Sequence, residues 1–318
     1  MLSISHKAKQ YLLAALKVFI IGSTFWYIYH KINTEVNENL NEFLETVFSK
    51  NTDHWSTLLF FIGLAVLNWL LESLKWKETV SALQSISFRN SIKQSLISLS
   101  VSLITPNRIG EYGAKAYFFQ KPFRKQVLLL NFFHNNAQLL ITLIFGLLGL
   151  SVIIPKFDIE ISFLNVLLLG IVLLGFCLLG YLLKERQLLL KGLTLKKVFQ
   201  YFKKIPKHLK AKIILLSLLR YIIFSGLFFL LLCFFGASLT YLEAMPLIFS
   251  MYLLVSVIPS VFIFDGVVRG GVAVWLFSLA EVGELIVLST VLIMWVLNFV
   301  FPAIVGSILF LKQKPKSL

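Results

Sequence analysis

Long apolar blocks separated by charged stretches constrain this sequence more than any other feature. A helix that crosses a membrane needs about 20 mostly apolar residues. Blocks of that length run over 11–29, 55–74, 127–154, 163–183, 213–235 and 285–311. Charged residues make up 14% of the chain, whereas about a quarter is usual in soluble domains. The sequence therefore predicts an all-α integral membrane protein with about six full spans.

Basic residues indicate on which side of the membrane each loop lies. The net charge is +15, and the Lys and Arg residues cluster between the apolar blocks. Loops rich in Lys and Arg stay in the cytoplasm, so 184–212 is predicted to be a basic cytoplasmic loop and both termini are predicted to be cytoplasmic. Within this loop, an apolar stripe over 195–205 fits a helix on an anionic membrane surface, or a solvated linker. We expect a protein of the bacterial cytoplasmic membrane that does not bind nucleic acid.

The chain is predicted to be a single membrane domain over 1–318. Residues 1–54 are expected to form an uncleaved first span and then an amphipathic helix on the outer surface. Acidic residues outnumber basic ones in the second part of this segment, which fits the outer side. The segment 163–183 is predicted to be a span that connects two larger units, 55–154 and 213–311.

Two further apolar blocks are broken in the middle. Thr105, Pro106 and Gly110 interrupt the block 96–119, and basic clusters flank it on both sides. A single crossing cannot place both flanks in the cytoplasm, so the pattern predicts a re-entrant hairpin. The alternative is that each broken block forms two true spans, which gives eight or more spans in total.

The second broken block, 246–279, is predicted to begin and end outside. Its proposed breaks are Pro259, Gly266 and Gly270. Each unit then consists of a span, a hairpin and a span, and the two units have opposite orientations. Inverted repeats with interrupted helices are typical of transporters, whose substrate site lies at the repeat interface.

Charged residues within the broken blocks are the candidate substrate-binding residues, namely Arg108, Glu111, Asp265 and Arg269. A charge at membrane depth costs about 2.5–3.5 kcal/mol on insertion scales, so such residues usually have a function. Arg108 could bind a phosphate through its planar guanidinium group, with Glu111 orienting it. The alternative is an ion pair that only stabilises the turn, and the same two interpretations apply to Asp265 and Arg269.

A polar patch lies within the predicted span 127–154 and consists of His134, Asn135, Asn136 and Gln138. Such groups commonly hold membrane helices together by hydrogen bonds, and a substrate or proton path is the alternative. One histidine without a second nitrogen or sulfur ligand does not predict a metal site. The sequence has no nucleotide-binding Gly-Lys loop and no nucleophile motif, so we expect no cofactor and no enzymatic activity.

The stretch SLITPNRIGEYGAKAYFF resembles the Thr-Pro-x-x-x-Gly-Glu motif of the lysylphosphatidylglycerol synthase transmembrane region, a family of flippase-like membrane proteins. The stretch VIPSVFIFDGVVRGGVAVWLF resembles the later Pro-containing, Gly-rich motif of that family, although Gly270 stands where the family commonly has Glu. The full synthases carry a separate soluble aminoacyl-transfer domain. The chain ends at Leu318, so we do not expect that domain or its lipid-aminoacylating activity here.

The resemblance implies movement of a phospholipid or lipid-linked sugar between leaflets, or support of an envelope enzyme. We expect a transporter for an anionic phospholipid or lipid-linked intermediate, with membrane lipids as its partners. Arg108 and Arg269 would neutralise the phosphate of the headgroup. The alternative is a non-transporting scaffold that docks a glycosyltransferase or another envelope-assembly enzyme through the 184–212 loop.

Overall fold

The computed structural model describes residues 54–102, 105, 109–160, 194–258 and 262–312. The predicted first span, the outer amphipathic helix and the connecting span 163–183 lie outside these residues. So do the prolines of both predicted breaks, Pro106 and Pro259.

All regular elements within the described residues are helical. Within the part of the chain that the structure describes, four helices are long and apolar enough to cross a membrane. They are α3 (His54–Val80), α6 (Arg124–Lys156), α9 (Lys207–Phe234) and a last span made of α12 (Glu284–Trp295), the π-helical turn η3 (Val296–Val300) and α13 (Phe301–Leu311). They confirm the apolar blocks predicted at 55–74, 127–154, 213–235 and 285–311.

Each broken block forms two shorter helices that pack against each other. The first block contains α4 (Phe88–Ser102) and α5 (Ile109–Tyr117), and the second contains α10 (Tyr241–Val257) and α11 (Phe262–Ser278). The first helix of each pair begins before the predicted boundary at 96 or 246. Helix α11 runs through Gly266 and Gly270, so the second break precedes this helix instead of lying at these glycines. Glycine is tolerated inside membrane helices because packing compensates for its low helix propensity.

The basic segment is helical over much of its described length. The 3-10 turn η2 (Lys121–Phe123) leads directly into α6. The next described helix is α8 (Leu195–Lys204), which belongs to the basic segment. Thr194 caps this helix, because its hydroxyl oxygen accepts a hydrogen bond from the Lys197 backbone N–H at 3.3 Å. Helix α9 begins at Lys207, so the predicted loop 184–212 ends earlier than expected and its last lysines belong to a spanning helix.

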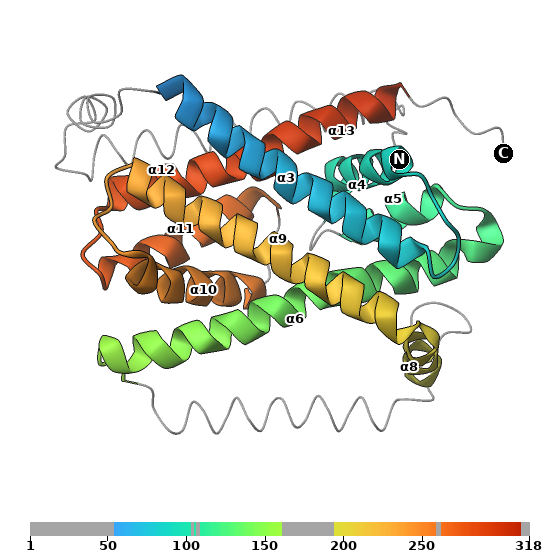
Figure 1. Cartoon of the computed structure of the whole chain (residues 1–318), viewed down its shortest axis with the longest axis horizontal. Helices are drawn as coiled ribbons and strands as arrows, with labels where there is room; N and C mark the ends of the chain where they lie inside the picture. The colour runs from blue at the N-terminus through green and yellow to red at the C-terminus, as the bar shows by residue number, and fades with distance from the viewer. Residues whose placement is uncertain (1–53, 103–104, 106–108, 161–193, 259–261, 313–318) are drawn as a thin grey trace, which may run out of the picture.

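The two halves interlock through their broken helices. Helix α4 packs on α13 of the other half, α10 packs on α6, and α3 packs on α9. The pair α4 and α5 lies toward one end of the long axis in Figure 1, and α10 and α11 lie toward the other.

Glycine allows close approach where α13 meets α4. A Cβ atom at Gly306 would overlap the backbone carbonyl of Leu96, one turn before Ser100. The Ser100 hydroxyl donates a hydrogen bond of 2.7 Å to the Ala303 carbonyl of α13. Small residues of this kind let the backbones of membrane helices come close together.

A similar contact joins α6 to α10. A Cβ atom at Gly149 would lie 2.6 Å from the Pro246 carbonyl and 2.7 Å from the Ser250 hydroxyl. The Ser250 hydroxyl donates a hydrogen bond of 2.8 Å to the carbonyl four residues earlier, and the single hydroxyl hydrogen of Ser100 is shared between the Ala303 carbonyl and the Leu96 carbonyl, which lies at 3.1 Å. The two contacts between the halves therefore share one arrangement. In each, a glycine from the last span of one half packs against a helical turn that contains a serine, in the first helix of the other half's broken block.

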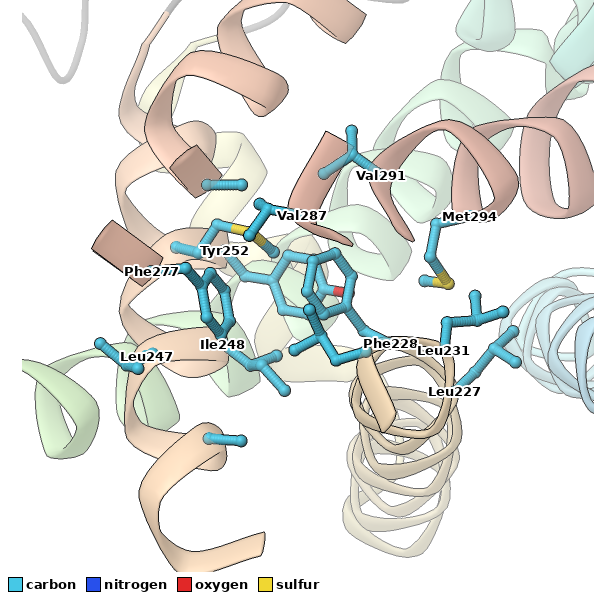
Figure 2. Close-up of a cluster of buried hydrophobic side chains, with 14 of the residues drawn as sticks. Leu227, Phe228, Leu231, Leu247, Ile248, Tyr252, Phe277, Val287, Val291 and Met294 are labelled. Atoms are coloured by element: carbon cyan, nitrogen blue, oxygen red, sulfur yellow. The ribbon is translucent and has the colours of Figure 1, made fainter. Parts of the chain in front are cut away.

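A large apolar core lies among α9, α10, α11 and α12. Figure 2 shows Phe228 of α9 beside Tyr252 of α10 and Phe277 of α11. The Phe228 ring lies 6.0 Å from the Phe277 ring and 6.1 Å from the Tyr252 ring. This packing holds the second half together on one side of a large polar cavity.

Candidate functional site: a charged cavity between the two halves

A cavity of about 620 Å³ lies where both halves of the chain meet. Its wall includes side chains from α3, α4, α5, α6, α9, α10, α11 and η3. The charged residues on this wall, among those that the structure describes, are Glu72, Lys75, Glu111, Lys115, Arg220 and Arg269. A wall with four cations and two carboxylates is unusual at membrane depth, where charges are costly.

One polar face of α3 organises the first group of charges. Asn68, Glu72, Lys75 and Thr79 are spaced by three or four residues, which places them on one side of a helix. Glu72 Oε2 lies 2.7 Å from Arg220 Nη1 and 3.2 Å from Lys75 Nζ. Glu72 thus interacts with two cations, one of them from a different spanning helix.

The last span also contacts this face, through its π-helical turn. Asn298 Oδ1 accepts a hydrogen bond from Asn68 Nδ2 at 2.9 Å, and its backbone carbonyl accepts one from Trp69 Nε1 at 3.0 Å. Asn68 Oδ1 in turn accepts from Arg220 Nε at 3.1 Å. A π-helical turn changes the carbonyl pattern of a helix and is frequent at functional sites. Here it lets the last span hydrogen-bond to the residues that hold Arg220.

The second group of charges belongs to α5. Lys115 Nζ lies 2.7 Å from Glu111 Oε1 and 2.8 Å from Asn131 Oδ1 of α6. The ammonium group also lies 4.3 Å from the centre of the Trp76 ring, within the range of a cation–π contact. Lys115 is 1% exposed, and its ammonium group is therefore stabilised by the protein instead of by water. Its partners are a carboxylate, an amide oxygen and an aromatic ring.

The turn before α5 is held by Thr105 and Gly110. The Thr105 hydroxyl donates a hydrogen bond to the Ser102 carbonyl at 2.9 Å and accepts one from the Gly110 backbone N–H at 2.7 Å. A Cβ atom at position 110 would lie 2.8 Å from the Thr105 hydroxyl oxygen, so glycine is needed there. These contacts place Glu111 in the first turn of α5, on the cavity wall.

Two of the predicted substrate-binding residues, Glu111 and Arg269, line the same cavity. The Arg269 guanidinium lies 5.5 Å from the ring centre of Phe299. Arg108 lies outside the described residues, so the predicted Arg108–Glu111 pair stays a prediction. Asp265 lies in α11, but its side chain is not among those described.

The predicted polar patch faces both the cavity and the neighbouring helices. Asn135, Asn136 and Gln138 line the cavity, and His134 is fully buried. Gln138 accepts a hydrogen bond from Lys75 Nζ at 3.4 Å and donates one to the Ser217 carbonyl of α9 at 3.3 Å. The patch therefore joins helices and also contributes polar groups to the cavity wall.

The substrate-binding residues predicted from the sequence did not include Glu72, Lys75, Lys115 or Arg220. The predicted span ends at residue 74, one residue before Lys75, but α3 continues to Val80 and Lys75 is 0% exposed. Two signals could have identified three of these residues. Glu72 and Lys75 continue the helical spacing from Asn68, and Arg220 is a lone charge inside an otherwise apolar block.

Comparison with known proteins identifies one family. The family model described as the lysylphosphatidylglycerol synthase TM region matches residues 14–306. No curated protein and no solved structure gives a match. The family match covers both halves of the chain and every element that lines the cavity.

Proposed function

The chain belongs to the lysylphosphatidylglycerol synthase transmembrane-region family, and on this basis we propose that it moves an anionic phospholipid or lipid-linked intermediate between leaflets. The observation that carries this proposal is the charged cavity between the halves, with Lys75, Lys115, Arg220 and Arg269 on its wall. A headgroup phosphate cannot enter hydrocarbon unless its charge is neutralised. Cations on the cavity wall, with Arg108 as a further candidate, would provide that neutralisation. The lipid leaves chemically unchanged, so the proposed activity is transport and not enzymatic catalysis.

Glu72 and Glu111 have a defined role in this proposal. Glu72 binds Lys75 and Arg220, and Glu111 binds Lys115, so these cations are not left without a counter-charge, which would carry a high cost. An arriving phosphate competes with the carboxylates for the same ammonium and guanidinium groups. The cations that the phosphate leaves are bound again by the carboxylates, as repeated binding and release of a lipid requires.

The proposed architecture is a pair of inverted repeats with re-entrant hairpins. The helices α4 and α5 measure about 22 and 14 Å at 1.5 Å per residue, which is less than the about 30 Å of hydrocarbon that a span must cross. The corresponding contacts α4–α13 and α10–α6 further support a repeat, since each pairs the first helix of one broken block with the closing span of the other half. Transporters with this organisation bind substrate at the repeat interface, where this cavity lies.

The proposed location is the bacterial cytoplasmic membrane, with both termini in the cytoplasm. The basic segment around α8 supports this orientation, because Lys-rich segments stay on the cytoplasmic side. Val198 of α8 is buried against the protein while Lys203 and Lys204 are exposed, so the helix can present its lysines to anionic headgroups.

A second candidate function is a scaffold for an envelope-assembly enzyme. The observation in its favour is Phe199 of α8, which is 66% exposed next to the exposed lysines. Aromatic residues are enriched in protein interfaces. In this case lipid movement would be absent, and a partner enzyme would depend on α8 for its binding.

The deciding experiment measures lipid movement in liposomes that contain the purified protein. Headgroup-labelled phosphatidylglycerol serves as the anionic probe and phosphatidylcholine as the neutral one. We expect movement of the anionic probe that is lost in Arg220→Gln and kept in Arg89→Gln, which changes an exposed arginine of α4. If neither lipid moves in liposomes with or without an ion gradient, transport is wrong and the scaffold becomes the favoured function.

A further inference from the structure

We propose that Glu72 and His134 form a proton-binding site whose protonation releases Arg220 and Lys75 for the phosphate of the lipid, so that proton and lipid anion move together. This inference rests on the proposed transport function. It gives a role to the most deeply buried member of the polar patch, because His134 is 0% exposed and lies behind the cavity wall. Buried ionisable chains within membrane segments commonly serve as proton relays.

The first step of the argument is the hydrogen bonding of the His134 ring. Nδ1 lies 3.3 Å from the Thr79 hydroxyl oxygen, and Nε2 lies 2.8 Å from Glu72 Oε1. Thr79 has one hydroxyl hydrogen, and its oxygen lies 2.7 Å from the Lys75 carbonyl oxygen. In the deprotonated pair, Nε2–H donates to Glu72 Oε1 and Nδ1 can accept from the Thr79 hydroxyl. An added proton fits on Nδ1, because the Thr79 hydroxyl then donates to the Lys75 carbonyl while its oxygen accepts from Nδ1–H.

The second step is that the two carboxylate oxygens of Glu72 contact different groups. Oε1 contacts His134, whereas Oε2 lies 2.7 Å from Arg220 Nη1 and 3.2 Å from Lys75 Nζ. Deprotonated, Glu72 holds both cations with a full negative charge. When a proton is shared with His134, that charge is neutralised and the hold on Arg220 and Lys75 weakens. Both cations line the cavity, so they are in place to bind an anion there.

The third step concerns the charges around Glu72 and His134, which favour binding of an anion when this pair is protonated. From α5, Glu111 and Lys115 face the same region, and from α11, Arg269 faces the cavity. From α4 and η3, the described neighbours Gln94 and Asn298 are neutral amides. The Trp76 ring meets the His134 ring edge-on at 5.7 Å. A proton added among these cations raises the local positive charge, so an anion stabilises the protonated state.

Charge and proton balance then define the coupling. One proton enters from the aqueous phase and binds between Glu72 and His134, and one phosphodiester anion binds to Arg220 and Lys75. The loaded site carries the same net charge as the empty one, so it can open to the other side without moving charge into hydrocarbon. There the lipid leaves, Glu72 recovers both cations, and the proton is released to water. Binding of each ligand strengthens binding of the other by the same factor, as linkage requires.

The first test measures proton uptake when lipid binds to the purified wild-type protein. Short-chain phosphatidylglycerol is added in weakly buffered detergent solution with a pH indicator. We expect uptake of up to one proton per bound lipid, and none when short-chain phosphatidylcholine is added. Binding of phosphatidylglycerol without proton uptake overturns the inference.

The second test imposes a pH gradient across liposomes, with potassium and valinomycin holding the membrane potential at zero. One pH unit corresponds to about a tenfold ratio of proton activity. Wild-type protein should therefore enrich labelled phosphatidylglycerol in the leaflet facing the alkaline side, by up to about tenfold. His134→Gln keeps a hydrogen-bond donor without a titrating proton and should show no gradient-driven enrichment of the lipid in either leaflet. His208→Gln makes the same change at an exposed histidine of α9 and should behave as wild type.

The outcomes separate this inference from the proposed function. Lipid movement that ignores the gradient in wild-type protein keeps transport and overturns proton coupling. A gradient response retained by His134→Gln also overturns the assigned site. If labelled phosphatidylglycerol neither binds nor moves, both proposals fail together. If His134→Gln does not fold, the uptake measurement on the wild-type protein decides alone.

Discussion

The Glu72 carboxylate of α3 accepts a hydrogen bond of 2.7 Å from the Arg220 guanidinium of α9, although 148 positions separate the two residues. These two helices open the two halves of the chain and pack against each other. The pair therefore joins the halves at the wall of the cavity between them. Its strength should influence both the stability of the protein and the availability of Arg220 to a ligand.

Arg220→Gln should lower the rate of phosphatidylglycerol movement at least about tenfold, because the cavity loses a cation that can bind phosphate. It should also destabilise the protein, since removing one partner of a buried pair costs about 3–5 kcal/mol, less here because Arg220 is 22% exposed. The double variant Arg220→Gln/Glu72→Gln should regain neither transport nor stability, because Glu72→Gln also removes the carboxylate that lies 3.2 Å from the buried Lys75. Lipid-movement and thermal-unfolding assays check both parts. Wild-type movement in the double variant would show that Arg220 does not bind the lipid.

Lys115→Met should lower the unfolding temperature because it leaves Glu111 without its cation in a nearly buried position. The Glu111 side chain is 16% exposed, so the cost should be about 3 kcal/mol. Glu111→Gln in the same chain should restore most of the loss. Lys203→Met, at an exposed position of α8, is the matched control and should leave the unfolding temperature unchanged. An equal fall in the single and double variants would contradict the ion-pair explanation.

The sequence predicted the four described spans well because apolar length determines them. It predicted the charged site only in part, and Lys75 shows why. This residue stands two positions before Lys77 at the end of an apolar block, and charge counting assigns such a pair to a loop. Its burial depends on Glu72 and Gln138, and the second of these contacts exists only when α3 and α6 meet. The helix boundaries were less predictable for the same reason, since packing extends a helix beyond its apolar residues.

Gly306→Ala and Gly149→Ala should each destabilise the protein, because the added methyl group meets backbone or serine atoms of a broken helix from the other half. Overpacking of this kind costs about 1–3 kcal/mol. Gly63→Ala is the matched control, since a Cβ atom at Gly63 meets nothing within 4 Å. It should be neutral or slightly stabilising, because alanine favours helix by up to about 1 kcal/mol. Thermal unfolding in detergent measures all three, and equal values would exclude close packing at these glycines.

The proposed hairpins predict that the turns between paired helices do not reach the opposite membrane surface. Single cysteines at Ile109, which begins α5, and at Ile258, which follows α10, would report on these turns in a chain whose natural cysteines are replaced. A membrane-impermeant maleimide should label Ile109→Cys slowly from the periplasmic side and Ile258→Cys slowly from the cytoplasmic side. Trp55→Cys and Lys312→Cys provide the positive controls, because both residues lie at ends of spanning helices.

Fast labelling of Ile109→Cys from the periplasm would mean that α4 and α5 cross the membrane as two true spans. That result would contradict the length argument, because α5 has 9 residues and reaches about 14 Å. If α4 and α5 form a hairpin, an anionic lipid should slow the labelling of Ile109→Cys. Tyr112 and Lys115 of the same helix line the cavity, so a lipid bound there would lie close to the labelled position. Protection by phosphatidylglycerol but not by phosphatidylcholine would place the lipid headgroup beside α5, and it would connect the topology of the first broken block directly to substrate binding.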